Sequence, residues 1–161
     1  MIDYTKEGDL HLVTMNAGPN VICPEWQQRM LDILDTVEAD CGKGAALILT
    51  GEDKFFCNGL NLEVVTQLAP QEMVLFGSRM AEIHQRFLVL PCPTVAAVNG
   101  HAFAGGAFMA LSCDYRIMRE DRGWFCVSEV DVGVPVPAGM MGILQGKLPA
   151  NTARDALLTG K

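Results

Sequence analysis

The sequence predicts an α/β fold whose strands are mostly parallel and covered on both faces. Two observations carry this prediction: apolar strand-like runs alternate with longer segments of helical periodicity, and the apolar runs are largely continuous. Half of the 161 residues are hydrophobic and 19% are charged, which is a globular composition. We expect one domain over residues 1–161, because no repeat, linker or low-complexity segment divides the chain.

The first third of the chain is expected to form a strand, a helix and a second strand. The first strand covers residues 10–15, and a loop follows over 16–23. Pro24 suits the first turn of a helix, and apolar residues at helical spacing carry that helix to about residue 39. A largely apolar strand over 45–50 and a turn over 51–54 come next.

The remaining elements continue this alternation. Helical periodicity covers residues 71–88, and Pro91 and Pro93 bracket a stop before an apolar strand over 94–98. The elements expected after it are a helix over 105–113, strands over 115–118 and 124–129, and two closing helical stretches. Strands joined through helices are typical of parallel sheets with right-handed crossovers.

Composition excludes several classes of partner. A net charge of −7 disfavours nonspecific nucleic-acid binding, which needs a basic surface. No apolar run reaches the roughly 20 residues that span a bilayer, and residues 1–20 lack the pattern of a signal peptide. We therefore expect an intracellular protein that binds neither nucleic acid nor membrane.

Cysteine and histidine spacing indicates neither disulfides nor a metal site. The six cysteines form no C-x-x-C pair, so we expect buried free thiols in a reducing compartment. The three histidines have no Cys or carboxylate spacing typical of metal ligands.

Two glycine-containing turns are candidates for binding an anion. The Asn58-Gly59 pair follows a buried strand, and Gly105-Gly106 opens an apolar helix after the strand over 94–98. Exposed backbone N–H groups at a helix start bind a phosphate or stabilise an oxyanion that forms during reaction. The alternatives, which either segment alone would favour, are an ordinary tight turn at the first site and close packing of helix on strand at the second.

The third candidate is a carboxylate in an apolar run, Glu129. Burial raises the pKa of a carboxyl group towards that of a working general base, whereas a solvent-facing strand end would leave Glu129 ordinary. Asp131 would share its face on an extended chain and is either a second acid or a surface residue. Cys57 is a further candidate nucleophile, but no neighbouring base is evident.

Taken together, these segments resemble the crotonase superfamily of enoyl-CoA hydratases and isomerases. Phe55-Phe-Cys-Asn-Gly-Leu-Asn-Leu62 is similar to the first oxyanion-hole loop of that family, and Asn99-Gly-His-Ala-Phe-Ala-Gly-Gly-Ala107 to the second. Ser128-Glu-Val-Asp-Val-Gly-Val-Pro135 matches a third segment in order and approximate spacing. The resemblance implies a spiral of ββα units, assembled as a homotrimer or a dimer of trimers.

The resemblance also implies roles for individual residues. The backbone N–H groups of Leu60 and Gly105 would bind the thioester oxygen of an acyl-CoA, and Glu129 would be the base. The substrate-binding residues it implies are Asn58, Gly59, Leu60, Asn61, Gly105 and Phe108. Coenzyme A is part of the substrate, so no separate cofactor and no metal is expected.

Phe108 distinguishes between the activities of this family. Hydratases carry a first glutamate at the position that Phe108 occupies here, and phenylalanine cannot help to activate water. A single base suits Δ3,Δ2-enoyl-CoA isomerisation, and the sequence is most similar to the plant-type peroxisomal isomerases, which favours a peroxisomal address. Three alternatives remain. The same scaffold could carry out hydration, decarboxylation or thioester hydrolysis. The chain could instead be a catalytically silent acyl-CoA binder or assembly subunit, or an unrelated α/β interaction domain.

Members of the family usually continue with helices that close the acyl pocket. We expect this chain, which ends at Lys161, to lack that C-terminal helical region.

Overall fold

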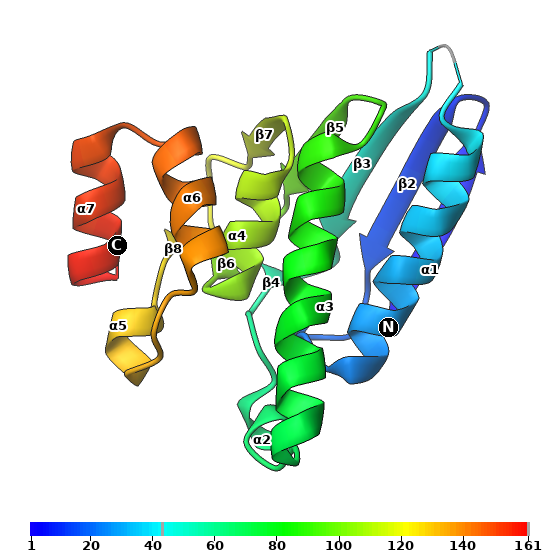
Figure 1. The fold of residues 1–161 in the computed structure, drawn as a ribbon. Helices are drawn as coiled ribbons and strands as arrows, with labels where there is room; N and C mark the ends of the chain where they lie inside the picture. Colours follow the sequence, from blue (N-terminus) through cyan, green and yellow to red (C-terminus); the bar gives the residue numbers. More distant parts are fainter. Residues whose placement is uncertain (43, 161) are drawn as a thin grey trace.

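A larger, mixed sheet and a small parallel sheet organise the fold (Figure 1). The computed structural model describes residues 1–42 and 44–160. The elements in chain order are β1 (Ile2–Glu7), β2 (Leu10–Met15), α1 (Pro24–Asp40), β3 (Ala46–Gly51), β4 (Phe55–Cys57), α2 (Leu62–Val65), α3 (Pro70–Val89), β5 (Thr94–Val98), β6 (His101–Phe103), α4 (Gly105–Ser112), β7 (Tyr115–Met118), β8 (Phe125–Cys126), α5 (Glu129–Val132), α6 (Ala138–Lys147) and α7 (Ala150–Thr159).

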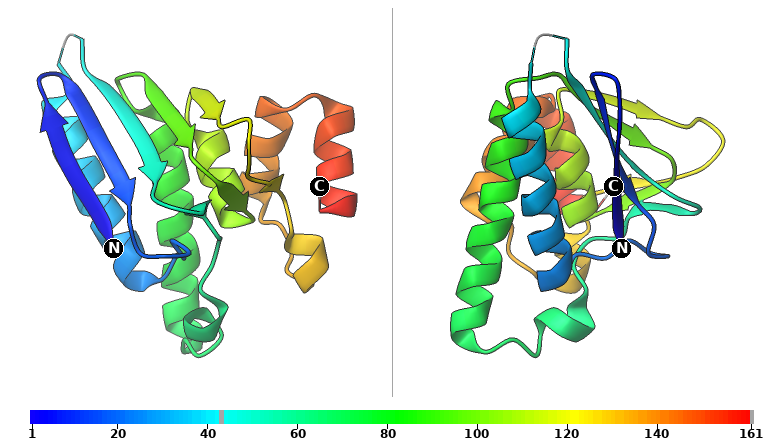
Figure 2. Two further views of the ribbon diagram at one scale, coloured as in Figure 1. Left: turned by 180° about the vertical axis from the view of Figure 1, so that it is seen from behind. Right: turned by 90° about the vertical axis from the view of Figure 1, so that its right-hand side faces the viewer.

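The larger sheet has the strand order β1-β2-β3-β5-β7 and is parallel except between β1 and β2. The predicted α/β class with mostly parallel strands is therefore confirmed. Helices α1, α3 and α4 lie on one side of this sheet, as the right-hand view of Figure 2 shows. Their apolar residues, such as Ile33 of α1 and Phe87 of α3, pack with Leu47 and Leu49 of β3 in the main core.

Among residues 1–42 and 44–160, helices cover one face of the larger sheet only (Figure 2). Side chains along β2 and β3 alternate between buried and half-buried, and all four residues of β7 are exposed. Ile117, for example, is 68% exposed. The expectation of cover on both faces is thus wrong for this chain, because an apolar run by itself does not say whether a second layer packs on its outer side.

The small sheet has the order β4-β6-β8, with all neighbouring strands parallel. The sequence predicts only one strand in this region, over 124–129, and the structure shortens it to Phe125–Cys126. These strands have two or three residues each, which is too short for a period-2 pattern to be visible in a sequence.

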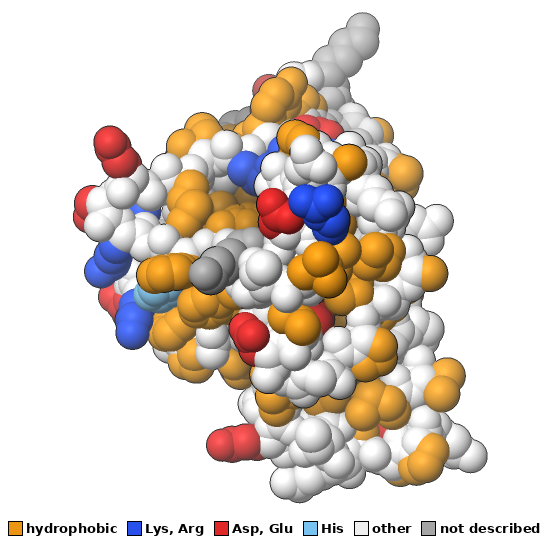
Figure 3. All heavy atoms as spheres, turned by 90° about the vertical axis from the view of Figure 1, so that its left-hand side faces the viewer, with side chains coloured by type: hydrophobic (Ala, Val, Ile, Leu, Met, Phe, Trp, Pro, Cys, Tyr) orange, Lys and Arg blue, Asp and Glu red, His pale blue; other side chains and the backbone are white. Residues whose placement is uncertain are grey.

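The C-terminal helices α6 and α7 form a second hydrophobic cluster with α4. Phe108 and Leu111 of α4 pack there with Ile143, Leu144 and other apolar residues. Beyond this cluster, hydrophobic side chains are exposed on the end of the molecule that α5, α6 and α7 form (Figure 3). Val130, Val132 and Leu158 are the large apolar residues of α5 and α7 exposed there.

A buried histidine joins α3 to α4. The Nδ1 atom of His84 lies 2.9 Å from the Oγ atom of Ser112, and Ser112 Oγ also lies 2.9 Å from the carbonyl oxygen of Phe108. His84 is 3% exposed, and its burial lowers the pKa of the imidazole from 6.5 to about 4. The folded protein therefore holds His84 neutral.

We expect the free energy of unfolding to fall as the pH drops from 6.5 towards 4. Over that range the unfolded chain binds a proton at His84 that the folded protein does not, which costs about 3 kcal/mol in all. Urea unfolding at pH 7.5 and pH 4.5 measures the loss. The His84→Leu variant should lose less stability between the two pH values than the wild type, and equal losses would contradict a role for this histidine.

Candidate active site

The three segments of interest each follow one strand of the small sheet. Asn58, Gly59 and Leu60 follow β4, Ala104 and Gly105 follow β6, and Glu129 lies three residues after β8. Because the carboxyl ends of parallel strands meet at one edge of a sheet, the short strands bring these distant segments to a common edge.

The first turn is held in place by the segment before α1. The N–H of Asn58 donates to the Pro19 carbonyl at 3.0 Å, the N–H of Ile22 donates to the Gly59 carbonyl at 2.8 Å, and the N–H of Asn61 donates to the Ile22 carbonyl at 2.9 Å. Gly59 has a φ of +81°, in the left-handed region that glycine adopts without strain. In residues 1–42 and 44–160 the Leu60 N–H has no hydrogen-bond acceptor, so it is free to bind a ligand oxygen.

The second turn presents the start of α4. The N–H of Ala104 donates to the Cys126 carbonyl of β8 at 2.9 Å, which ties this turn to the strand before Glu129. Ala104 has φ 47° and ψ −118°, an uncommon conformation for a residue with a Cβ atom. Gly105 is the first residue of α4, where the helix supplies no acceptor for its N–H.

The two turns touch each other. A Cβ atom added to Gly59 would lie 3.4 Å from the Gly105 nitrogen, and one added to Gly105 would lie 3.6 Å from the Gly59 Cα atom. The structure therefore brings the Leu60 and Gly105 segments together, as two donors to one oxygen require.

Gly106 sets how closely α4 approaches β4. A Cβ atom at Gly106 would lie 2.2 Å from the carbonyl oxygen of Cys57, which is a clash with backbone. The packing reading of the second glycine motif is therefore confirmed, and the same packing places the start of α4 beside the first turn.

We expect Gly106→Ala to destabilise the protein by about 2–3 kcal/mol, because α4 must move away from β4 to relieve the clash. Gly77→Ala is the matched control: Gly77 lies in α3 with no atom within 4 Å of an added Cβ, and alanine there should be neutral or stabilising by under about 1 kcal/mol. Chemical denaturation of both variants measures the difference. If the two variants were equally stable, α4 could move away from β4 without loss of stability, and the expected cost of the clash at Gly106 would be wrong.

Glu129 is a buried, incompletely partnered carboxylate. It is 8% exposed, and within the described part of the chain its Oε2 atom is buried without a hydrogen-bond partner. Burial raises the pKa of this carboxyl group above its ordinary value of 4.5. A raised pKa with a free oxygen is the property of a general base.

The expected strand over 124–129 is wrong at its end, because Glu129 begins the short helix α5. Asp131 then does not share its face as on an extended chain: Asp131 is exposed, whereas Glu129 is buried. The surface reading of Asp131 is the one that the structure confirms.

Phe108 is fully buried one turn into α4, in the cluster that α4 forms with the C-terminal helices. It therefore provides a buried apolar side chain at this position of the glycine-rich helix.

The two asparagines of the first turn have different surroundings. Asn58 is exposed, whereas Asn61 caps α2, its Oδ1 atom accepting from the Val64 N–H at 3.4 Å. Sequence reasoning missed a third asparagine, Asn20, which is 1% exposed and donates to the carbonyls of Phe55 at 3.0 Å and Phe56 at 3.3 Å. The preceding Gly18-Pro19 turn was its only signal, and nothing in the sequence marked Ala104.

The structure gives little support to a cysteine nucleophile or a metal site. Burial raises the pKa of the Cys57 thiol to about 12, which suppresses the thiolate that a nucleophile needs. Within residues 1–42 and 44–160, no three His, Cys, Asp or Glu side chains come together as metal ligands would. None of the helices described here is long and apolar enough to cross a bilayer.

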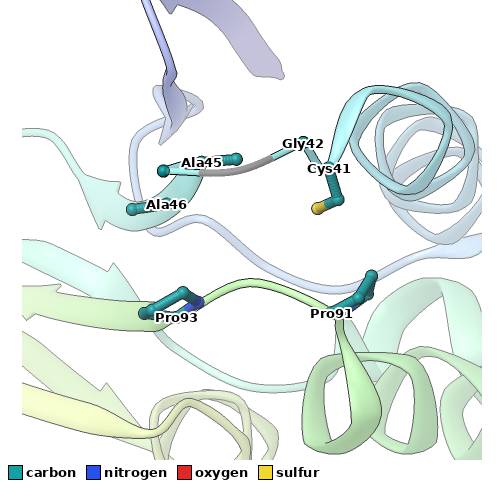
Figure 4. A pocket seen from close by; sticks show the side chains of 7 residues that line it. Cys41, Gly42, Ala45, Ala46, Pro91 and Pro93 are labelled. Carbon is teal, nitrogen blue, oxygen red and sulfur yellow. The ribbon is translucent and has the colours of Figure 1, made fainter.

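An open surface pocket lies away from these turns. Cys41, Ala46 and Pro93 are among the residues that line it, so it sits where β3 and β5 begin, not where the turns follow the strand ends (Figure 4). We therefore assign it no part in the candidate active site.

Comparison with known proteins identifies the family. The sequence model of the family described as enoyl-CoA hydratase/isomerase matches residues 5–161. Enoyl-CoA delta isomerase 3 of Arabidopsis thaliana is 37% identical over 166 residues, which cover all of this chain and 70% of that protein. The peroxisomal enoyl-CoA delta isomerase 2 of the same plant is 35% identical over 170 residues, with the same coverage.

Solved structures of both hydratases and isomerases resemble the fold. An enoyl-CoA hydratase from Mycobacterium ulcerans superposes with a TM-score of 0.89 at 28% identity, over 99% of this chain and 69% of that one. A Mycobacterium tuberculosis protein, named as an enoyl-CoA isomerase in one structure and as a probable enoyl-CoA hydratase in another, gives TM-scores of 0.88 and 0.89 at 26% identity. The two superpositions cover 99% of this chain and 69% and 67% of that protein. Similarity of fold alone thus does not separate the two reactions.

Proposed function

Because the chain belongs to the crotonase family of enoyl-CoA hydratases and isomerases, we propose that it is a Δ3,Δ2-enoyl-CoA isomerase with Glu129 as its base. One observation carries the choice of isomerase: Glu129, three residues after β8, is a buried carboxylate, while α4 has the buried apolar residue Phe108 at the position where the resemblance implies a second carboxylate in hydratases. The similarity to two plant isomerases supports the same choice.

In the proposed reaction, the carboxylate of Glu129 removes a proton from C2 of a 3-enoyl-CoA. The electron pair of that C–H bond moves into a dienolate, and negative charge develops on the thioester oxygen. The N–H groups of Leu60 and Gly105 would stabilise this oxyanion, each by roughly 3 kcal/mol. Protonated Glu129 then returns the proton to C4, and the double bond lies between C2 and C3.

The raised pKa of Glu129 suits both halves of this reaction. A carboxylate with a raised pKa is a stronger base towards C2, and the carboxylic acid holds its proton long enough to deliver it to C4. A water molecule would need a second polar group to orient it, and Phe108 provides none.

The proposal extends to the oligomeric state and the subcellular location of the protein. A homotrimer or dimer of trimers would cover exposed apolar residues such as Val130 and Leu158. The isomerase 2 of Arabidopsis is named as peroxisomal, which supports a peroxisomal address for this chain.

A pair of assays tests the proposal. We expect a 3-enoyl-CoA to be converted to the conjugated 2-enoyl-CoA, followed by its ultraviolet absorbance, and crotonyl-CoA to be hydrated at least about 100-fold more slowly for want of a second acid–base group. Hydration that matches or exceeds isomerisation would identify a hydratase. Calorimetric binding of acyl-CoA without either turnover would identify a silent binder.

A further inference from the structure

Two cysteines that are distant in the sequence meet at the end of the molecule away from the candidate active site. The Sγ atoms of Cys41 and Cys92 lie 3.0 Å apart, although 51 positions separate the two residues. Cys41 follows the C-terminal end of α1, and Cys92 lies between α3 and β5. We propose that this pair is an oxidation site at which a peroxide forms an intramolecular disulfide.

The backbone on both sides suits a cross-link. Cys92 stands between Pro91 and Pro93, whose rings fix φ and hold the thiol in place. Cys41 lies just past the end of α1 and precedes Gly42. The backbone at Cys41 therefore has more conformational freedom than the backbone at Cys92. A disulfide has an S–S length of about 2.05 Å, so the sulfur atoms need to approach by only about 1 Å.

The surroundings give the two thiols different roles. Cys41 is half-buried and lines the open pocket at the start of β3, and Figure 4 shows its sulfur directed into that space. Cys92 is 6% exposed, and burial, together with the neighbouring Cys41 thiol, raises its pKa to about 12. An oxidant therefore reaches Cys41 first, and Cys92 is positioned to react with the oxidised sulfur.

Hydrogen peroxide supplies the oxidising equivalents in two steps. The Cys41 thiolate attacks one peroxide oxygen, so that an S–O bond forms, the O–O bond breaks, and the departing hydroxide takes up a proton to become water. The Cys92 sulfur then loses its proton and attacks Cys41, so that the S–S bond forms and the second oxygen leaves as water. Two thiols are oxidised to one disulfide and one peroxide is reduced to two waters.

The cross-link would close a large loop that contains β3, β4, α2 and α3. Such a loop restricts the unfolded chain, so the oxidised protein should unfold at a temperature roughly 5–10 °C higher than the reduced protein. The pair lies where β3 and β5 begin, whereas the turn at Asn58–Leu60 follows the end of β4, so this inference does not depend on the proposed activity.

Mass spectrometry after oxidation tests the proposal. The reduced wild-type protein is treated with a small excess of hydrogen peroxide, denatured, alkylated with iodoacetamide and digested. We expect a peptide pair that joins Cys41 to Cys92, two hydrogens lighter than the free thiols, which disappears on treatment with dithiothreitol. The rise in unfolding temperature should disappear with it.

Cysteine variants show whether Cys41 and Cys92 are responsible for the cross-link and for the rise in unfolding temperature. Cys41→Ser and Cys92→Ala should each abolish the cross-link and the thermal shift, while each reduced variant is checked for folding by circular dichroism. Cys23→Ser is the matched control, because Cys23 is the other half-buried thiol, and it should be cross-linked like the wild type. Full alkylation of Cys41 and Cys92 after peroxide, or a rise in unfolding temperature on oxidation that persists in Cys41→Ser, would overturn the proposal.

Discussion

Replacing Glu129 by glutamine is expected to lower kcat for the isomerisation of a 3-enoyl-CoA by about 10³–10⁴-fold. Glutamine has nearly the same shape but cannot accept the C2 proton, so the loss measures the general base itself. Glu129 is buried and its Oε2 atom has no partner among residues 1–42 and 44–160, so the neutral amide removes no salt bridge described there. The absorbance of the conjugated product gives the rate, and calorimetry should show that the affinity for acyl-CoA is retained.

Asp131→Asn provides the control for a change of charge two residues away. Asp131 is exposed, so its substitution should leave kcat within about twofold of the wild type. If Asp131→Asn were the damaging substitution and Glu129→Gln were active, the assignment of the base would be wrong.

The pH profile of kcat/KM reports on the same residue. The base must be ionised to act, so kcat/KM falls as the pH falls through the pKa of Glu129 in the free enzyme. Burial raises that pKa, which places the acidic limb of the profile above pH 4.5. An acidic limb at or below the ordinary carboxyl value would contradict a buried carboxylate as the base.

The second large effect is expected at Leu60, where the backbone matters more than the side chain. Proline removes the free N–H, and loss of one oxyanion donor costs roughly 10²–10³-fold in kcat. Leu60→Ala keeps the N–H and removes only part of a partly buried side chain, so it should retain activity within about tenfold. A proline at Gly105 should resemble Leu60→Pro.

Thermal unfolding of these variants accompanies the kinetics, so that loss of donor is distinguished from loss of fold. Full activity of a folded Leu60→Pro variant would exclude this N–H as an oxyanion donor. An inactive Leu60→Ala variant with normal stability would instead assign the role to the side chain.

Sequence patterns predicted the long elements well. The helix expected over 71–88 is α3, Pro70–Val89, and the strand expected over 94–98 is β5. Both are long or apolar enough for periodicity and flanking prolines to mark them. The strands β4, β6 and β8 lack that length, so the small sheet that arranges the site was not foreseen.

Local sequence motifs identified the candidate groups but not their surroundings. The Asn58-Gly59 turn and the Gly105-Gly106 helix start are visible because Asn-Gly and Gly-Gly pairs are recognisable turn signals in a sequence. Their physical reasons differ: Gly59 has a left-handed φ, whereas Gly106 leaves room for the Cys57 carbonyl. Pro19 and Ile22 hold the first turn in place, and Asn20 holds the preceding strand β4. These contacts join distant parts of the chain, so no local pattern records them. The strained backbone of Ala104 is likewise invisible, since alanine has no preference for it.

By itself, the sequence determined the α/β class, the order of the main elements and the residue types available for chemistry, because these depend on hydrophobic periodicity and on the chemistry of individual side chains. Only the tertiary structure decided that the three short strands are parallel neighbours, that a Cβ atom at Gly106 would clash with Cys57, and that Glu129 is buried while Asp131 is exposed. It also brought Cys41 to Cys92. The physical reason is common to all of these: burial, pKa and contact are properties of neighbours in space, and those neighbours are far apart along the chain.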